Sequence, residues 1–255
     1  MRKAVYVVLI IVLLGIFGYS AYLVGDYLLE KHRSDVSIAE AAEHVRVIGR
    51  PDIHKESGET GNEAEEDEEP VPEGIEVDFD ALWKLNTDIV AWLYSPDTPI
   101  NYPVVQSGDN EYYLRRLLDG SWNIGGTLFL DYRCPADFSH GNNIIYGHQM
   151  RSGTMFGSLK RYRDQSYYDA HPVMYLATPA GQYRVELFAG CTVSAFHEIY
   201  DTDVTEDQLL ELMKQSTFAP EHPIELDGPI LTLSTCAYDF ENARYIVMGK
   251  LVPIS

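Results

Sequence analysis

Cys236 lies near the end of a run, ILTLSTCAY, that has the alternating pattern of a β-strand. Alternation places Leu231 and Leu233 on one face of this strand and puts Cys236 on the other, among hydroxyl side chains. A thiol at the polar end of a strand is poorly placed to be an inert core residue. It could act as a nucleophile if a base or a cation holds it as the thiolate.

The other two cysteines differ from Cys236 in their surroundings. Cys191 shares its strand parity with Leu187 and other apolar residues, which predicts a small buried hydrophobe. Cys134 precedes a proline in a loop and stays unassigned, as a free thiol without a predicted partner. Three widely spaced cysteines do not form a closed disulfide framework, and they lack the CxxC spacing of a metal site.

A histidine could serve as the base, and the chain has eight. His148 ends the run NNIIYGHQM, where Gly147 relaxes the backbone as a strand leaves its sheet. Rigid strand ends are good places to hold catalytic groups. A lone histidine is more often structural, so the residues alone favour His148 only slightly over His140, which lies in a loop.

Arg244 is the third candidate, because it opens the last strand-like run eight residues after Cys236. A tight connection would return it beside the cysteine on the neighbouring strand. There a guanidinium could hold a substrate carbonyl or stabilise an oxyanion. The alternative is a surface arginine paired with Asp239 or Glu241, and the residues alone leave both interpretations open.

Short β-rich runs separated by turn residues must position these side chains, and eight such runs predict a barrel or a sandwich. A short helix capped by Asp78 should precede them. The predicted strands are 90–94, 102–106, 126–131, 143–146, 173–177, 183–194, 230–236 and 244–252, and helical insertions are predicted near 110–118, 154–162 and 206–216.

Residues 4–25 contain no charged side chain and predict a transmembrane helix. At about 1.5 Å per residue, this run crosses an apolar bilayer core of about 30 Å. Two basic residues precede it, which places residues 1–3 in the cytoplasm and the chain after Asp26 outside. A cleaved signal peptide is the alternative, but the run exceeds a usual signal-peptide core, so we favour an uncleaved, single-pass anchor.

The acidity of the chain is concentrated after this anchor. The net charge is −20, and residues 51–78 carry 12 acidic side chains and one basic. Such a stretch should be extended and solvated, although it could also be an acidic binding tail or a calcium-binding segment. We therefore predict an extracellular stalk over 26–76, whose first part could continue as a helix, and a folded domain over 77–255. The charge disfavours nucleic acid as a partner.

Several motifs together resemble the sortases, and class B most closely. The strongest are TLSTC ending at Cys236, IIYGHQM with His148, and NARYIVMGKL with Arg244. Further similar segments are DIVAWLYSP, INYPVVQSGDNEYYL, GGTLFLDYR and GTMFGSLKRYRD. The resemblance extends over nearly all of residues 78–255.

The resemblance implies a mainly β fold, an eight-stranded sortase β-barrel with N-terminal helices and a helix between strands six and seven, which the segment 206–216 fits. It also implies a cysteine transpeptidase without metal or other cofactor, held in the cell membrane of a Gram-positive bacterium by residues 4–25.

The same resemblance implies the roles of the site residues. Cys236 would attack the threonine carbonyl of an NPxT-type or related sorting motif in a surface protein and form a thioacyl enzyme. An amine of the peptidoglycan precursor lipid II, or of a pilin lysine, would resolve it. His148 would be the general acid/base, and Arg244 would position substrate and stabilise the oxyanion. The implied substrate-binding positions are Ser234, Thr235, Asn110 and Leu114.

Three points stay open at this stage. The residues after the cysteine, Ala237-Tyr238-Asp239, differ from those of some class B members, so an acidic partner for His148 is not assigned. Pilin polymerisation or net hydrolysis could replace wall anchoring. A stalked extracellular binding module, in which Cys236 is merely a core thiol, is the non-enzymatic alternative.

Overall fold

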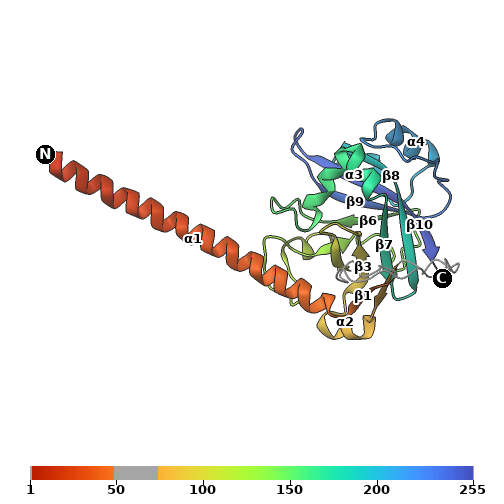
Figure 1. Cartoon of the computed structure of the whole chain (residues 1–255), viewed down its shortest axis with the longest axis horizontal. Coiled ribbons are helices and arrows are strands. Elements are labelled where there is room, and N and C mark those ends of the chain that lie inside the picture. Colours follow the sequence, from red (N-terminus) through yellow and green to blue (C-terminus); the bar gives the residue numbers. More distant parts are fainter. Residues whose placement is uncertain (1, 49–73, 255) are drawn as a thin grey trace, which may run out of the picture.

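The candidate residues lie on a closed barrel of eight strands at the end of a long N-terminal helix (Figure 1). The computed structural model describes residues 2–48 and 74–254. Around the barrel the strands follow the order β10-β8-β7-β3-β4-β5-β6-β9. The β4–β5 and β6–β9 pairs are parallel and the other pairs are antiparallel.

All eight predicted strands are present. The strand to which Cys236 belongs is buried on both faces up to the cysteine. Leu231 and Leu233 belong to the barrel core, and the hydroxyl side chain of Thr232, on the other face, donates to buried Asn142. The barrel strands are β3 (Ile89–Tyr94), β4 (Asn101–Val105), β5 (Leu128–Leu130), β6 (Asn142–Tyr146), β7 (Val173–Thr178), β8 (Gly181–Ser194), β9 (Ile230–Cys236) and β10 (Ala243–Ile254).

Helices α2 (Phe79–Leu85) and α4 (Glu206–Lys214) both lie on the outside of the barrel. In α2, the Asp78 carboxylate accepts a hydrogen bond from the Ala81 N–H at 2.9 Å, as the sequence predicts. The second, α4, begins with a reciprocal capping box between Thr205 and Gln208. It packs its apolar side on the outer face of β8 and β10. The predicted helix between the sixth and seventh barrel strands is therefore confirmed.

The other two predicted helical insertions are 3-10 turns rather than α-helices. They are η1 (Tyr113–Arg115) and η2 (Phe156–Arg163), and a further short helix that the sequence analysis missed, α3 (Gln165–Ala170), follows directly. Around η1 the backbone carbonyls of Tyr113 and Arg115 accept hydrogen bonds from Thr127 and Asn123. These cross-loop bonds replace the i to i+4 bonds that an α-helix would need.

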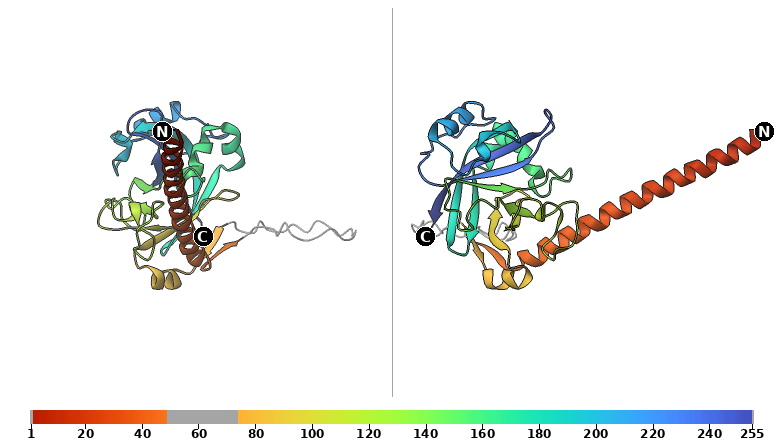
Figure 2. Two further views of the ribbon diagram at one scale, coloured as in Figure 1. Left: turned by 90° about the vertical axis from the view of Figure 1, so that its left-hand side faces the viewer. Right: turned by 180° about the vertical axis from the view of Figure 1, so that it is seen from behind.

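The N-terminal helix α1 (Arg2–Ala42) extends beyond the predicted membrane segment. It projects as one rod away from the barrel, as Figure 1 and the right-hand view of Figure 2 show. It is the one helix among the described residues that is long and apolar enough to cross a membrane. Its last turns pack on the barrel, where Ala41 is fully buried and Ile38 contacts the core.

The segment predicted as a stalk is folded against the barrel at both of its ends. After α1, β1 (Val45–Ile48) pairs with β2 (Gly74–Val77), with Ile48 opposite Gly74. Most of the acidic run, 49–73, lies outside the described residues. The two strands that flank it pair, so Ile48 and Gly74 lie side by side. The predicted helical continuation of the anchor is present, since α1 extends to Ala42, and the strand Val45–Ile48 was not predicted. Burial of Ala41 and Ile75 against barrel residues stabilises the end of α1 and the strand β2 in this position.

Buried Asn142, at the start of β6, generates a stability prediction. Its side-chain N–H groups donate to the carbonyls of Ile199 and Asp201 at 2.7 and 2.9 Å, and its carbonyl accepts from the Thr232 hydroxyl at 2.7 Å. Asn142→Ala leaves these buried groups unpaired and should lower the free energy of unfolding by about 2–4 kcal/mol. Urea unfolding followed by tryptophan fluorescence measures this.

The matched control for that experiment is Gln215→Ala, which shortens an exposed side chain. It should change the free energy of unfolding by no more than about 0.5 kcal/mol. Equal effects of the two substitutions would contradict the assignment of Asn142 as a buried cross-link.

Candidate active site

Three neighbouring strands meet at one end of the barrel and bring the predicted residues together. Cys236 ends β9 and Arg244 lies at the start of β10, and the two are directly opposed in the strand register. Parallel β6 ends beside β9, where the Gly147 N–H donates to the Ser234 carbonyl at 3.1 Å. His148 follows directly, so all three predicted catalytic residues leave the sheet at the same place.

These strand ends border an open cavity of ≈ 480 Å³, which we call the cleft. Its walls come from β5, β6, β9, β10, the loops before and after β5, and the connections after β6 and β8. Every residue predicted as catalytic or substrate-binding lines it: Asn110, Leu114, His148, Ser234, Thr235, Cys236 and Arg244. The remaining walls are Phe129, Arg133, Tyr146, Gly147, Ala195 and Tyr200.

Cys236 is the half-buried cysteine of the three, and the other two thiols are buried. Burial raises the pKa of Cys191 to about 11, and its sulfur contacts the Leu212 carbonyl at 3.1 Å. Burial also raises the pKa of Cys134, which lies in the barrel core. The prediction for Cys191 is confirmed, and Cys134, left unassigned from sequence, is a core thiol.

His148 is partly buried at the wall of the cleft. Its Nε2 lies 2.8 Å from the backbone carbonyl oxygen of Leu114. Burial lowers the pKa of this imidazole and the charge of Arg115 adds to the effect, while the bond to the Leu114 carbonyl opposes both. His140 is not among the residues that line the cleft.

Arg244 faces the cleft, and its Nη1 donates to the Ala243 carbonyl at 3.0 Å. Its predicted surface partner Asp239 is engaged elsewhere, since Arg163 donates to both of its carboxylate oxygens at 2.9 and 2.7 Å. Among the described residues Arg244 has no ion pair with Glu241 either. The surface-pair interpretation of Arg244 is therefore wrong.

The predicted substrate-binding positions use their polar atoms in different ways. The Ser234 and Tyr200 hydroxyls share a hydrogen bond of 2.8 Å, and the Thr235 hydroxyl donates to the Gly147 carbonyl at 2.8 Å. The Asn110 side-chain oxygen accepts from the Tyr132 N–H at 3.1 Å. The side chain of Leu114 is 38% exposed and supplies apolar surface to the cleft.

A network that sequence reasoning missed supports one wall of the cleft. Fully buried Asp131 binds the Arg133 guanidinium through two hydrogen bonds, of 2.9 and 2.7 Å, and accepts from the Tyr146 hydroxyl at 3.0 Å. Arg133 also donates to the Tyr200 carbonyl at 2.8 Å, and the rings of Tyr146 and Tyr200 stack. Burial raises the pKa of Asp131, but its hydrogen bonds to Arg133 and Tyr146 outweigh burial and lower it overall.

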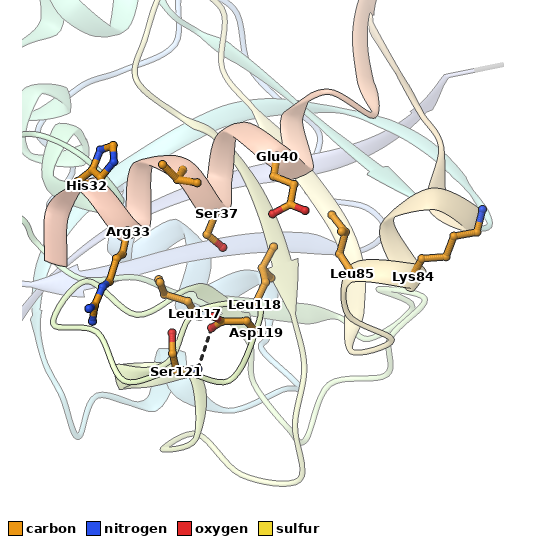
Figure 3. A pocket seen from close by; sticks show the side chains of 11 residues that line it. His32, Arg33, Ser37, Glu40, Lys84, Leu85, Leu117, Leu118, Asp119 and Ser121 are labelled. Carbon is orange, nitrogen blue, oxygen red and sulfur yellow. Dashed lines mark hydrogen bonds between the residues drawn. The ribbon is translucent and has the colours of Figure 1, made fainter. Parts of the chain in front are cut away.

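A second and larger cavity, of ≈ 690 Å³, lies between α1, α2 and residues 117–121. Figure 3 shows Arg33 and Glu40 of α1 on the side of the helix that faces this loop, in which Asp119 accepts a hydrogen bond from the Ser121 N–H at 2.8 Å. None of the residues predicted to carry the chemistry lines it. Cavity volume alone would therefore have favoured this second cavity over the cleft at the three strand ends.

Comparison with known proteins identifies the family. The family model for the sortase domain matches residues 93–252. The chain belongs to the sortase family. Sortase B of Listeria monocytogenes is 33% identical over 252 residues, which cover 96% of this chain and 95% of that protein. Sortase B of Staphylococcus aureus is 30% identical over 190 residues, covering 72% of this chain and 78% of that protein.

Solved sortase B structures share the barrel. A 2.0 Å structure of Staphylococcus aureus sortase B superposes with a TM-score of 0.64 at 31% identity, covering 69% of this chain and 87% of that one. Sortase B from B. anthracis, in complex with AAEK1, gives a TM-score of 0.69 at 28% identity, covering 89% of this chain and 100% of that one. The protein is thus a sortase of class B, an enzyme of the cysteine transpeptidase type.

The burial of the thiols predicts selective alkylation. In the folded sortase at pH 8, iodoacetamide should modify Cys236 at least about tenfold faster than Cys134 or Cys191, because buried thiols react only after local opening. Peptide mass spectrometry over a time course measures the three rates. In denaturant the rates should converge, and rapid labelling of Cys134 or Cys191 in the folded protein would contradict the assignment.

The lowered pKa of His148 predicts a pH dependence of stability. Between the folded pKa and the unfolded value of about 6.5, the unfolded chain binds more protons, so stability falls as the pH falls. The free energy of unfolding of the wild type relative to His148→Gln should therefore decrease from pH 7.5 to about pH 5. Parallel urea titrations measure it, and an increase in that difference would contradict the cause assigned here.

Proposed function

We propose that this sortase anchors surface proteins to the cell wall. Cys236 would cleave an NPxT-type or related sorting motif after its threonine, and the acyl fragment would pass to an amine of the peptidoglycan precursor lipid II. The observation that carries this proposal is the meeting of Cys236, His148 and Arg244 at one open cleft.

The first step forms the thioacyl enzyme. The Cys236 thiolate attacks the threonine carbonyl carbon, and the carbon–nitrogen bond of the scissile amide breaks after the tetrahedral intermediate. Arg244, directly opposite Cys236 in the register, can donate N–H groups to the oxyanion. His148, as the imidazolium, gives a proton to the leaving amine.

The second step reverses these proton movements. Neutral His148 takes a proton from the incoming amine, which attacks the thioester carbonyl and expels the Cys236 thiolate. Burial lowers the pKa of the imidazole, which favours the neutral form that this step requires. One histidine at a strand end can therefore serve both half-reactions.

The walls of the cleft support a peptide as substrate. Asn110, Ser234 and Tyr200 offer polar contacts, and Leu114 and Thr235 complete the surface near the thiol. A solved structure of a Staphylococcus aureus sortase B–substrate complex, 30% identical to this chain, supports the proposal that this sortase also binds a substrate. The NPxT-type motif follows from class membership.

Membrane anchoring is part of the proposal. Residues 4–25 would span the membrane of a Gram-positive bacterium once, with residues 1–3 in the cytoplasm and the barrel outside. The apolar side chains of this part of α1 are exposed, as Ile10, Leu14 and Phe17 illustrate. That surface would be covered by lipid, and the cleft would face the compartment where lipid II is presented.

Product analysis tests the proposal. The full chain in lipid nanodiscs is given an NPxT-type peptide and triglycine as the amine, a choice that follows a solved sortase B structure in complex with triglycine. Mass spectrometry should find the amide adduct in excess over the free acid. Cys236→Ala should form neither product, and Cys134→Ala, which shortens a core thiol, should retain the adduct.

Each alternative has its own outcome in that experiment. Free acid as the main product at saturating triglycine would show a hydrolytic sortase. Transfer to a lysine-bearing pilin peptide, without transfer to triglycine, would show pilus assembly. Product formation by Cys236→Ala at the wild-type rate would contradict the cysteine mechanism itself.

A further inference from the structure

The partner of His148 is a backbone carbonyl. Among the described residues, its imidazole has one hydrogen bond, from Nε2 to the Leu114 oxygen at 2.8 Å. Asp239, the acidic residue that follows Cys236 in sequence, is held by Arg163 through two hydrogen bonds. The orientation of the ring therefore depends on the loop that carries Leu114 rather than on a carboxylate.

This hydrogen bond selects a tautomer. A carbonyl oxygen only accepts hydrogen bonds, so Nε2 must carry a proton while the contact is made. In the neutral ring Nδ1 is then the unprotonated nitrogen, and it is the atom that can gain and lose a proton.

In the loop between β4 and β5, the carbonyls on either side of Leu114 are bonded within the loop, and the Leu114 carbonyl is bonded to His148. The Tyr113 carbonyl accepts from the Thr127 N–H at 3.1 Å, and the Arg115 carbonyl accepts from the Asn123 N–H at 2.9 Å. These two bonds tie the first half of the loop to its second half. The Leu114 oxygen, between them, is directed to His148.

At Gly126 the second half of this loop comes closest to its first half, at Tyr113 and Leu114. Its φ is +57°, and a Cβ at this position would lie 2.5 Å from the Leu114 oxygen and 2.6 Å from the Tyr113 oxygen. Both distances are below any tolerable contact, and both atoms belong to the backbone. A side chain at residue 126 must therefore displace the carbonyl that holds His148.

The far side of the loop is braced by α1. Buried Asn123 donates to the Glu30 carbonyl at 2.8 Å and accepts from the Gly125 N–H at 2.9 Å. Figure 3 shows Leu117, Leu118 and Asp119 of the same loop facing α1 across the second cavity. Because α1 contacts the other side of the loop, the loop cannot shift freely to make room for a side chain at residue 126.

We propose that Gly126 is a positioning residue for the transpeptidation reaction: it allows the Leu114 carbonyl to reach His148 Nε2, and this contact keeps Nδ1 as the proton-exchanging atom. The inference rests on the proposed function, in which His148 is the general acid/base. Gly126 itself lies outside the residues that line the cleft.

The test compares Gly126→Ala with Gly228→Ala in the full chain. Gly228 has a φ of +90° and no atom within 4 Å of an added Cβ, so Gly228→Ala introduces the backbone strain without the contact. Gly126→Ala should lower kcat with the sorting peptide by about 10²-fold, the scale expected for a misplaced catalytic group. Gly228→Ala should stay within about twofold of the wild type.

A spectroscopic readout makes the test independent of activity. In ¹⁵N-histidine-labelled wild type, above the pKa of the ring, His148 should show a protonated Nε2 and an unprotonated Nδ1. Gly126→Ala should show a mixture of tautomers, and Gly228→Ala should match the wild type. A wild-type ring protonated on Nδ1 would overturn the inference, even if Gly126→Ala fails to fold.

His148→Ala distinguishes the positioning role of Gly126 from the acid/base role of His148. Loss of activity in His148→Ala, with equal activities and tautomers in the two glycine variants, would overturn the positioning role and leave the proposed function standing. Full activity in His148→Ala would instead overturn the assignment of the acid/base.

Discussion

The register of three neighbouring strands is the constraint on which the site depends. Directly opposed residues of an antiparallel pair have Cα atoms about 4.5–5.5 Å apart, so the β9–β10 pairing holds Arg244 beside Cys236. A slip of one residue would turn Arg244 to the other face. The register is held by burial of Leu231 and Leu233 in the barrel core. The same hydrophobic contacts that close the barrel therefore also assemble the residues of the cleft.

The loops around the cleft provide hydrogen-bond partners for the reactive side chains that the strands carry. The Leu114 carbonyl reaches His148 from a loop that leans on α1 through Asn123. Thus the helix that we propose as a membrane anchor also supports a wall of the cleft, and the paired β1 and β2 strands attach it to the barrel. The anchor and the catalytic domain are in this sense one folded unit among the described residues.

Sequence patterns predicted the parts of the structure that depend on local information. Alternation gave the strands, and motif spacing gave Cys236, His148 and Arg244 as candidates. The network of Asp131, Arg133, Tyr146 and Tyr200 had no local signal, because its members meet only after the barrel closes. The engagement of Asp239 by Arg163, 76 positions earlier, likewise could not be read from Arg244 and its neighbours. The pairing of β1 with β2 had no local signal either, because the two strands lie on opposite sides of the acidic run.

The central claim is that Cys236 carries the acyl group between the two half-reactions. The most direct measurement is the intact mass of the full chain, quenched in acid during turnover of an NPxT-type peptide without added amine. The account predicts a mass increase equal to the peptide fragment that ends at threonine, located on Cys236 by peptide mapping and released by hydroxylamine. Turnover without such an adduct, or an adduct on Cys134 or Cys191, would contradict it.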